Sequence, residues 1–254
     1  MSTWPLWTSG LLLVLGLPAA AVGVQLALRR RWSALSEGDH NEAAGFLIAI
    51  VGVIYAVLLA FVVIVSWEQF STAADTVGHE ASALRAIERT AAPFPPEARA
   101  VIHADVDAYV RAVVDTEWPA MSRGEPGSPR VGPTLDRLSA DLEALPAETP
   151  VRVQFVSAEV ERFNDLVTAR STRLDFVEGG LPGVLWAALV VGAVVTIAFA
   201  MVFALRSPLL QTFMIGSIAL LIGILLFVAV AIDHPFAGDV AVTPGPLERV
   251  LVDF

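Results

Sequence analysis

The chain has 254 residues, a formal net charge of −10 and a hydrophobic fraction of 56%. This acidic balance argues against nucleic-acid binding, which depends on basic patches that neutralise phosphates. The sequence contains no cysteine, which excludes disulfides, iron–sulfur clusters, thiolate zinc sites and cysteine nucleophiles.

Four long segments without charged residues predict four membrane-spanning helices: 4–28, 44–66, 181–205 and 209–232. At 1.5 Å per residue, each segment is long enough to cross a hydrocarbon core of about 30 Å. No Lys or Arg precedes the first segment, so we expect a retained anchor rather than a cleaved signal peptide. We therefore expect a multi-pass protein of the cell membrane, with the lipid bilayer as its main partner.

The arginines of the short loops predict the orientation. Arg29, Arg30 and Arg31 follow the first span, and Arg206 lies between the third and fourth spans, on the same side. Basic residues in short loops usually face the cytoplasm. Both termini and the segment between spans two and three are therefore predicted to be extracytoplasmic.

That segment, 68–178, holds 19 acidic residues and 11 arginines. Apolar residues recur in it at three- and four-residue steps, and proline and glycine clusters divide it into four stretches: Phe70–Ile87, Ile102–Val113, Val131–Leu145 and Val153–Val177. Such a pattern predicts four amphipathic helices that bury their apolar stripes in a bundle. In the last stretch, Arg170 occupies one apolar position.

The predicted fold is thus an all-α integral membrane protein with a four-helix soluble bundle inserted between its second and third spans. We expect three parts: a first pair of spans at 1–67, the acidic helical domain at 68–178, and a second pair of spans with a short tail at 179–254.

Motifs of enzyme chemistry are missing from the sequence. His79-Glu80 begins like a zinc-protease motif, but Ala83 stands where the second histidine would be. There is no nucleophile elbow, phosphate-binding loop or dinucleotide fingerprint. We therefore expect no enzyme activity, no metal site and no cofactor.

The spans contain no ionisable side chain except Tyr55. Proton-coupled transporters usually need intramembrane Asp, Glu, Lys or His, so this composition argues against that class. A pore with apolar walls stays open as a possibility, because a narrow apolar constriction can gate by dewetting.

The second span has two distinct faces about 130° apart at 100° per residue. Its small-residue face comprises Gly45, Ala49, Gly52, Ala56 and Ala60, and its bulky face comprises Ile50, Ile54, Val57 and Phe61. A small face ordinarily packs on another helix, and a bulky face ordinarily meets lipid. The functional alternative makes the bulky face the neck of a pore in an oligomer. The fourth span adds helix-packing candidates at Gly216, Ala219 and Gly223.

Several motifs stand out along the chain: Tyr55, Trp67, Glu68, Glu80, Tyr109, Glu117, Trp118, Pro119, Asp233, His234, Pro235 and Phe236. Together these residues resemble a widespread bacterial family of membrane proteins described as bestrophin-like. We expect Asp233 and Pro235 to end the fourth span and Phe236 to anchor at the membrane interface, as aromatic residues often do.

The resemblance implies a function. Bestrophins are pentameric anion channels with four membrane helices per subunit, a helical domain after the second, and an apolar neck lined by that second helix. By analogy we expect a homo-oligomer, with five as the implied subunit number, that conducts ions passively past Ile50, Ile54, Val57 and Phe61. The acidic insert and its predicted extracytoplasmic side depart from bestrophins. The alternative is a non-conducting sensor or scaffold whose bundle binds a partner or a ligand.

Overall fold

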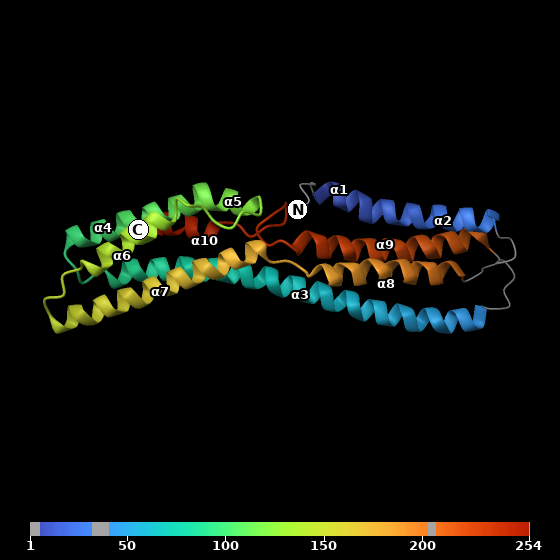
Figure 1. Ribbon diagram of the computed structural model, residues 1–254, viewed down its shortest axis with the longest axis horizontal. Coiled ribbons are helices and arrows are strands. Elements are labelled where there is room, and N and C mark those ends of the chain that lie inside the picture. The colour runs from blue at the N-terminus through green and yellow to red at the C-terminus, as the bar shows by residue number, and fades with distance from the viewer. Residues whose placement is uncertain (1–5, 32–40, 203–206, 254) are drawn as a thin grey trace. The chain divides into compact units, whose positions relative to one another are not determined.

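The computed structural model describes residues 6–31, 41–202 and 207–253, and all regular secondary structure in these ranges is helical (Figure 1). The chain forms two compact units, one of residues 1–68 and 180–233 and the other of residues 69–179 and 234–254. Arg206 and the predicted span ends at 4–5 and 203–205 lie outside the described residues.

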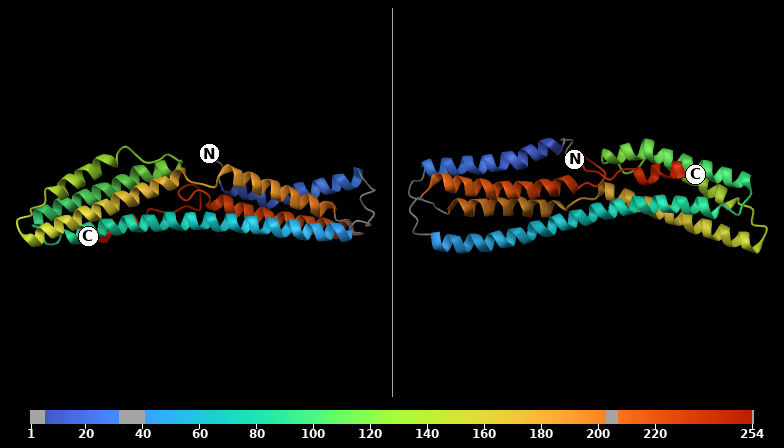
Figure 2. Two further views of the ribbon diagram at one scale, coloured as in Figure 1. Left: turned by 60° about the horizontal axis from the view of Figure 1, so that its bottom comes forward. Right: turned by 180° about the vertical axis from the view of Figure 1, so that it is seen from behind.

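The first unit is built from helices long and apolar enough to cross a membrane. They are the continuous helix formed by α1 (Leu6–Gly10), the π-helix η1 (Leu11–Gly16) and α2 (Leu17–Arg31), then the first half of α3 (Asn41–Thr90), α8 (Gly183–Val202) and α9 (Pro208–Ile232). The all-α fold with four spanning helices is confirmed. Helix α9 packs along both α2 and α8 (Figure 2).

Close backbone contact holds α9 against the first helix. At Gly223 an added Cβ would lie 2.1 Å from the carbonyl oxygen of Leu13, so only glycine permits this approach. Ala219 is fully buried, and Gly216 faces Val22 at ordinary contact distance. Small residues allow spanning helices to approach in this way.

The second unit contains residues 69–90 of α3 and the helices that follow it. These are α4 (Pro96–Ala112), the π-helix η4 (Val113–Glu117), α5 (Trp118–Ser122), α6 (Gly132–Glu143) and α7 (Pro150–Glu178). Helix α7 begins where Pro150 takes the first helical position and the Thr149 hydroxyl accepts a hydrogen bond from the Arg152 amide. Apolar side chains of all these helices fill one core, which includes Val77, Leu84, Ile102, Val106, Leu138 and Leu166.

The C-terminal tail belongs to this second unit rather than to the spanning helices, and it carries α10 (Gly245–Glu248) and α11 (Val250–Asp253). Phe236, Leu247 and Val250 are buried in its core. The expectation that Phe236 anchors at a membrane interface is therefore wrong, because its ring is 3% exposed and packs on protein.

The apolar stripe of α7 also differs from the prediction. Val153, Val160 and Val167 of the seven-residue repeat are 39–49% exposed, whereas Glu159 and Arg173 are fully buried. These three valines therefore point away from the core, whereas the other members of the repeat, Val156, Phe163, Leu174 and Val177, pack against it. Hydrophobicity alone could not separate the two groups, because Glu159 and Arg173 lie on the inner face.

Candidate functional site

Helix α3 packs on its own unit through a face that contains Tyr55, Leu59, Val62 and Ser66, all of them buried. The Tyr55 ring lies directly over Gly192 of α8, where an added Cβ would come within 2.5 Å of the ring. Gly192 therefore makes room for Tyr55, and the pair fixes how α3 is turned about its axis within this unit.

The bulky face of α3 points away from that packing face. Ile50, Ile54, Val57 and Phe61 are between 43% and 65% exposed in the single chain. At 100° per residue, they cluster about 140° from Tyr55, Leu59 and Val62. These side chains are thus free to meet lipid, a second subunit or an aqueous pore.

The small-residue face of α3 is a third face, about 90° from the packing face. Ala49, Ala56 and Ala60 are exposed, and Gly45 and Gly52 are partly covered. An added Cβ at Gly52 would meet nothing within 4 Å. Among the described residues, Gly52 on this face therefore makes no close helix contact, in contrast to Gly223 on α9.

The second unit contains a buried ion-pair cluster centred on Arg173, whose side chain is fully buried. Its Nε and Nη2 donate to Oε2 and Oε1 of Glu80 at 2.6 and 3.1 Å. The same Nη2 donates to Oε1 of Glu117 at 2.8 Å. One guanidinium group on α7 therefore holds two carboxylates, one on α3 and one on η4.

Two further side chains complete the pairing. Arg170 donates to both oxygens of Glu117 at 3.2 and 2.6 Å. The Tyr109 hydroxyl donates to Oε1 of Glu80 at 2.6 Å. Two arginines thus balance two carboxylates. Buried ions need such pairing and hydrogen bonding, because an unpaired charge in the interior is costly.

The pairing shows in the pKa values of the cluster. Burial alone would raise the pKa of Glu117, but hydrogen bonds and charge from Arg170 and Arg173 hold that pKa below its usual value. Burial and the adjacent Glu80 carboxylate raise the pKa of Tyr109 well above its ordinary range. The Glu117 carboxylate therefore acts as a permanent anion, and the phenol stays a hydrogen-bond donor.

Aromatic and backbone groups enclose the cluster. The guanidinium carbon of Arg173 lies 5.4 Å from the centroid of the Trp118 ring, and that ring meets Phe236 edge-on at 5.6 Å. The Ser128 amide donates to Oε2 of Glu117 at 3.2 Å, after a turn in which Gly127 adopts a φ of +88°. The motif residues Glu80, Tyr109, Glu117, Trp118 and Phe236 therefore converge on one buried site.

Asp233 has a comparable role in the first unit. It is 6% exposed, and its Oδ1 accepts a hydrogen bond from the Leu181 amide at 2.8 Å. This bond ties the end of α9 to the turn that precedes α8. In contrast, the motif residues Trp67, Glu68 and Pro119 are exposed.

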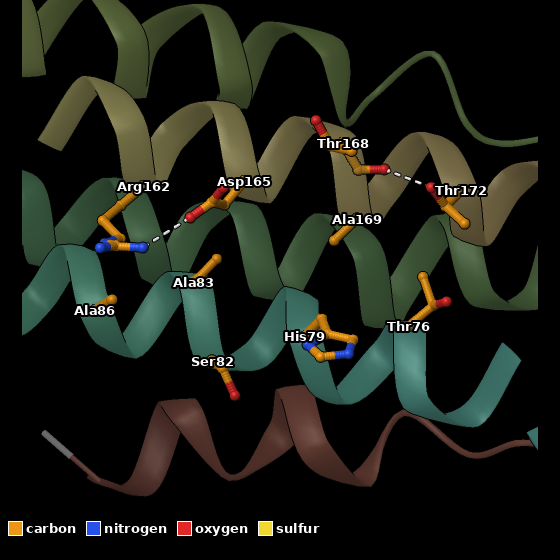
Figure 3. Close-up of a pocket in the computed structure, with 10 residues that line it drawn as sticks. All are labelled: Thr76, His79, Ser82, Ala83, Ala86, Arg162, Asp165, Thr168, Ala169 and Thr172. Carbon is orange, nitrogen blue, oxygen red and sulfur yellow. Dashed lines mark hydrogen bonds and ion pairs between the residues drawn. The ribbon is translucent and has the colours of Figure 1, made fainter. Parts of the chain in front are cut away.

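An open groove of about 560 Å³ runs between α3 and α7 in the second unit (Figure 3). Alanines form part of its wall, and its polar lining includes His79, Ser82, Thr168 and the Arg162–Asp165 ion pair at 2.9 Å. Within the described ranges, no group of three or more His, Asp or Glu side chains could hold a metal ion.

Comparison with known proteins places the chain in a family. Residues 15–247 match the Bestrophin-like domain. The chain belongs to this family. The resemblance inferred from the motif residues is thereby confirmed. No curated protein matches the chain.

Solved structures share the Bestrophin-like fold. An Ile-to-Thr variant of a bacterial Bestrophin homolog from Klebsiella pneumoniae is 15% identical, with a TM-score of 0.73 over 98% of this chain and 99% of that one. A Tyr-to-Ala variant of that homolog is 16% identical, with a TM-score of 0.70 over 96% and 98% of the two chains. At these identities the likeness concerns the fold.

The motif residues of this Bestrophin-like chain include the acidic and aromatic members of the buried cluster, but not its centre. In the sequence Arg170 only interrupts an apolar repeat, and no motif marks Arg173. A usable signal was present, because a charged residue at an apolar position of a helix must find a buried partner.

Proposed function

We propose that the protein is a passive ion channel whose pore is lined by the first half of α3. The observation that carries this proposal is the exposed, uncharged face formed by Ile50, Ile54, Val57 and Phe61 on a spanning helix of a Bestrophin-like protein. Such a face can form a hydrophobic neck that conducts when it is wetted.

The three faces of α3 support a ring of subunits. One face packs within the chain, which leaves the small-residue face for a neighbouring subunit and the bulky face for the axis. Small residues suit close contact between spanning helices. We propose a homo-oligomer in the cell membrane, with five subunits as in bestrophins.

We propose anions as the conducted ions, on the analogy with bestrophins, although the −8 charge of residues 68–178 would repel them at a nearby mouth. The reversal potential under a KCl gradient across a planar bilayer shows whether the conducted ion is an anion or a cation. A cation-selective potential would reject anion conduction and leave the pore proposal in place.

Trimming the neck tests the pore itself. Ile54→Ala and Phe61→Ala should raise ion flux in reconstituted vesicles, because a wider apolar ring wets more easily. Ala56→Leu on the small face should instead disturb assembly, seen as an altered mass in native lipid. If neither the wild type nor Phe61→Ala carries ion current in planar bilayers, the channel proposal is rejected.

A non-conducting sensor is the second candidate, and the groove between α3 and α7 favours it (Figure 3). The hydroxyls of Thr76, Ser82 and Thr172 donate to carbonyls of their own helices at 2.8–2.9 Å. Their oxygens therefore stay available as acceptors toward a ligand. A monomer or dimer without flux would favour this candidate.

We propose that the second unit lies outside the cytoplasm, from Arg29–Arg31 and Arg206. In this cysteine-free chain, Ala147→Cys should react with a membrane-impermeant thiol reagent in intact cells, and Ser36→Cys should not. The reverse labelling would overturn this topology.

A further inference from the structure

A second groove, of about 310 Å³, runs along the outside of the first unit between α9 and the η1–α2 helix. Its lining includes Leu15 and Pro18 on one helix and Thr212, Phe213 and Gly216 on the other. Leu15 and Phe213 are more than half exposed in the single chain. Because both helices are spanning helices, this groove opens toward lipid hydrocarbon rather than water.

One end of this groove is polar and carries hydrogen-bond donors. The Thr212 hydroxyl donates to Oε1 of Gln25 at 3.2 Å, and Arg29 Nη1 donates to Oε1 of Gln211 at 3.1 Å. Thr212 lines the groove and Gln211 precedes it in the chain, so these two bonds bring Arg29 close to the polar end of the groove.

Positive charge is concentrated at the same end. Arg29, Arg30 and Arg31 occupy the last turn of α2. Arg29 follows Gln25 by four residues and Pro18 by eleven, so the three side chains lie on one face of the helix. The Thr212 end of the apolar groove therefore lies beside a cation, because Arg29 pairs with Gln211, the neighbour of Thr212.

We propose that this groove binds a phospholipid with an anionic headgroup. One acyl chain lies along Leu15, Pro18 and Gly216, and the phosphate oxygens accept hydrogen bonds from the Arg29 guanidinium. Basic pockets between spanning helices recognise anionic headgroups in this way, and charged hydrogen bonds to phosphate are strong. The site is independent of the proposed pore.

Gly216 gives the groove its depth. An added Cβ there would meet only Val22, at 3.6 Å, so a longer side chain can be accommodated by projecting into the groove. The new side chain in a Gly216→Leu variant would thus displace the acyl chain without disturbing the backbone. Gly23 on α2 is the matched control, because an added Cβ there meets nothing within 4 Å.

The experiment is native mass spectrometry of the full-length protein released from nanodiscs that contain equal amounts of phosphatidylglycerol and phosphatidylcholine. The wild type should retain phosphatidylglycerol about fivefold over phosphatidylcholine, which corresponds to one well-placed arginine. Arg29→Gln should remove this preference. Gly216→Leu should lower retention of both lipids, whereas Gly23→Leu should leave retention unchanged.

Three results would overturn the proposal. An equal loss of preference in Arg31→Gln would show general surface attraction instead of a site. Displacement by glycerol phosphate would show an anion site without a chain groove. A change of subunit number in Gly216→Leu, with lipid retention intact, would show that a second copy fills the groove.

A second groove-filling variant covers the case in which Gly216→Leu does not fold. Leu15→Trp fills the same groove from an exposed position, so folding should tolerate it. It should lower lipid retention as Gly216→Leu does. A folded Leu15→Trp protein that retains phosphatidylglycerol like the wild type would also reject the site.

Discussion

The helices of the two units are held together by different kinds of contact. In the first unit, glycines at 192 and 223 let a ring or a backbone carbonyl approach within contact distance, and the core is apolar. In the second unit, two arginines and two glutamates share the interior with apolar side chains. The first unit therefore depends on shape and the second on charge balance, so each should fail under a different kind of substitution.

The largest effect is expected from breaking the charge balance. Arg173→Met keeps a similar volume but leaves Glu80 without its guanidinium partner and Glu117 with only one. Removing one partner of a buried ion pair typically costs about 3–5 kcal/mol. Thermal unfolding of the detergent-solubilised protein should show this loss. Arg111→Met is the control, because its ion pair with Asp107 is exposed and 3.8 Å long. Equal stability of the two variants would contradict a central role for Arg173.

A shape-based substitution in the first unit should have the next largest effect. Gly223→Ala forces a methyl group against the Leu13 carbonyl, and overpacking of this kind costs about 1–3 kcal/mol. Gly23→Ala, which meets nothing, should be neutral or slightly stabilising. The melting temperatures of both variants in the same detergent provide the comparison. If Gly223→Ala melts at the wild-type temperature, α9 and the first helix can move apart without loss of stability.

The second unit should also respond to pH through Glu159. Burial and the nearby Glu88 carboxylate raise the pKa of Glu159 from 4.5 to about 8, and both of its oxygens lack hydrogen-bond partners within the described ranges. The folded state therefore holds the proton more tightly than the unfolded state. Stability from this group is present below a pH of about 4.5 and is lost as pH rises toward 8, by at most about 1.4 kcal/mol per pH unit.

Glu159→Gln should flatten that dependence between about pH 5 and pH 8 and stabilise the protein at alkaline pH. A second buried carboxyl group titrates in this range, since the pKa of Asp105 is raised to about 6 by burial and by Asp141. A pH profile of melting temperature that is identical in Glu159→Gln and the wild type would assign the slope to Asp105.

The smallest effect is expected at Asp233. Its Oδ1 accepts from the Leu181 amide, and Asn offers the same acceptor, so Asp233→Asn should cost less than about 1 kcal/mol and leave any flux unchanged. Asp233→Ala should cost more, because a buried amide loses its partner. A stable Asp233→Asn protein without activity would show that the carboxylate has a functional role.

The sequence predicted the first unit better than the second for a physical reason. Uninterrupted apolar runs are an unambiguous signal of spanning helices, and the four spans were found from them. In the bundle, the same rule assigned Val153 and Val160 to the core, although they are exposed, and gave no sign that Glu159 is buried. Periodicity treats charge as a sign of exposure, and it cannot reveal a partner that lies far away in the sequence.

The candidate pore residues show a similar limit. The bulky face of α3 was visible from spacing, and its exposure in the single chain agrees with a face that lies outside the intrachain packing. The surroundings of this bulky face are formed by neighbouring subunits or by lipid. The spacing of residues in one chain does not reveal which of the two it meets. Tyr55 illustrates the contrast, because its partner Gly192 belongs to the same chain.

The shared guanidinium of Arg173 has a consequence for how this protein diverges over generations. Glu80, Glu117 and Arg173 cannot be exchanged one at a time without cost, since every intermediate genotype would carry an unbalanced interior charge. Lineages should therefore either inherit the trio unchanged or replace it in a single correlated step. The exposed valines of α7 face no such barrier and are free to drift, so aligned descendants should show coupled substitution inside the bundle and independent substitution outside it.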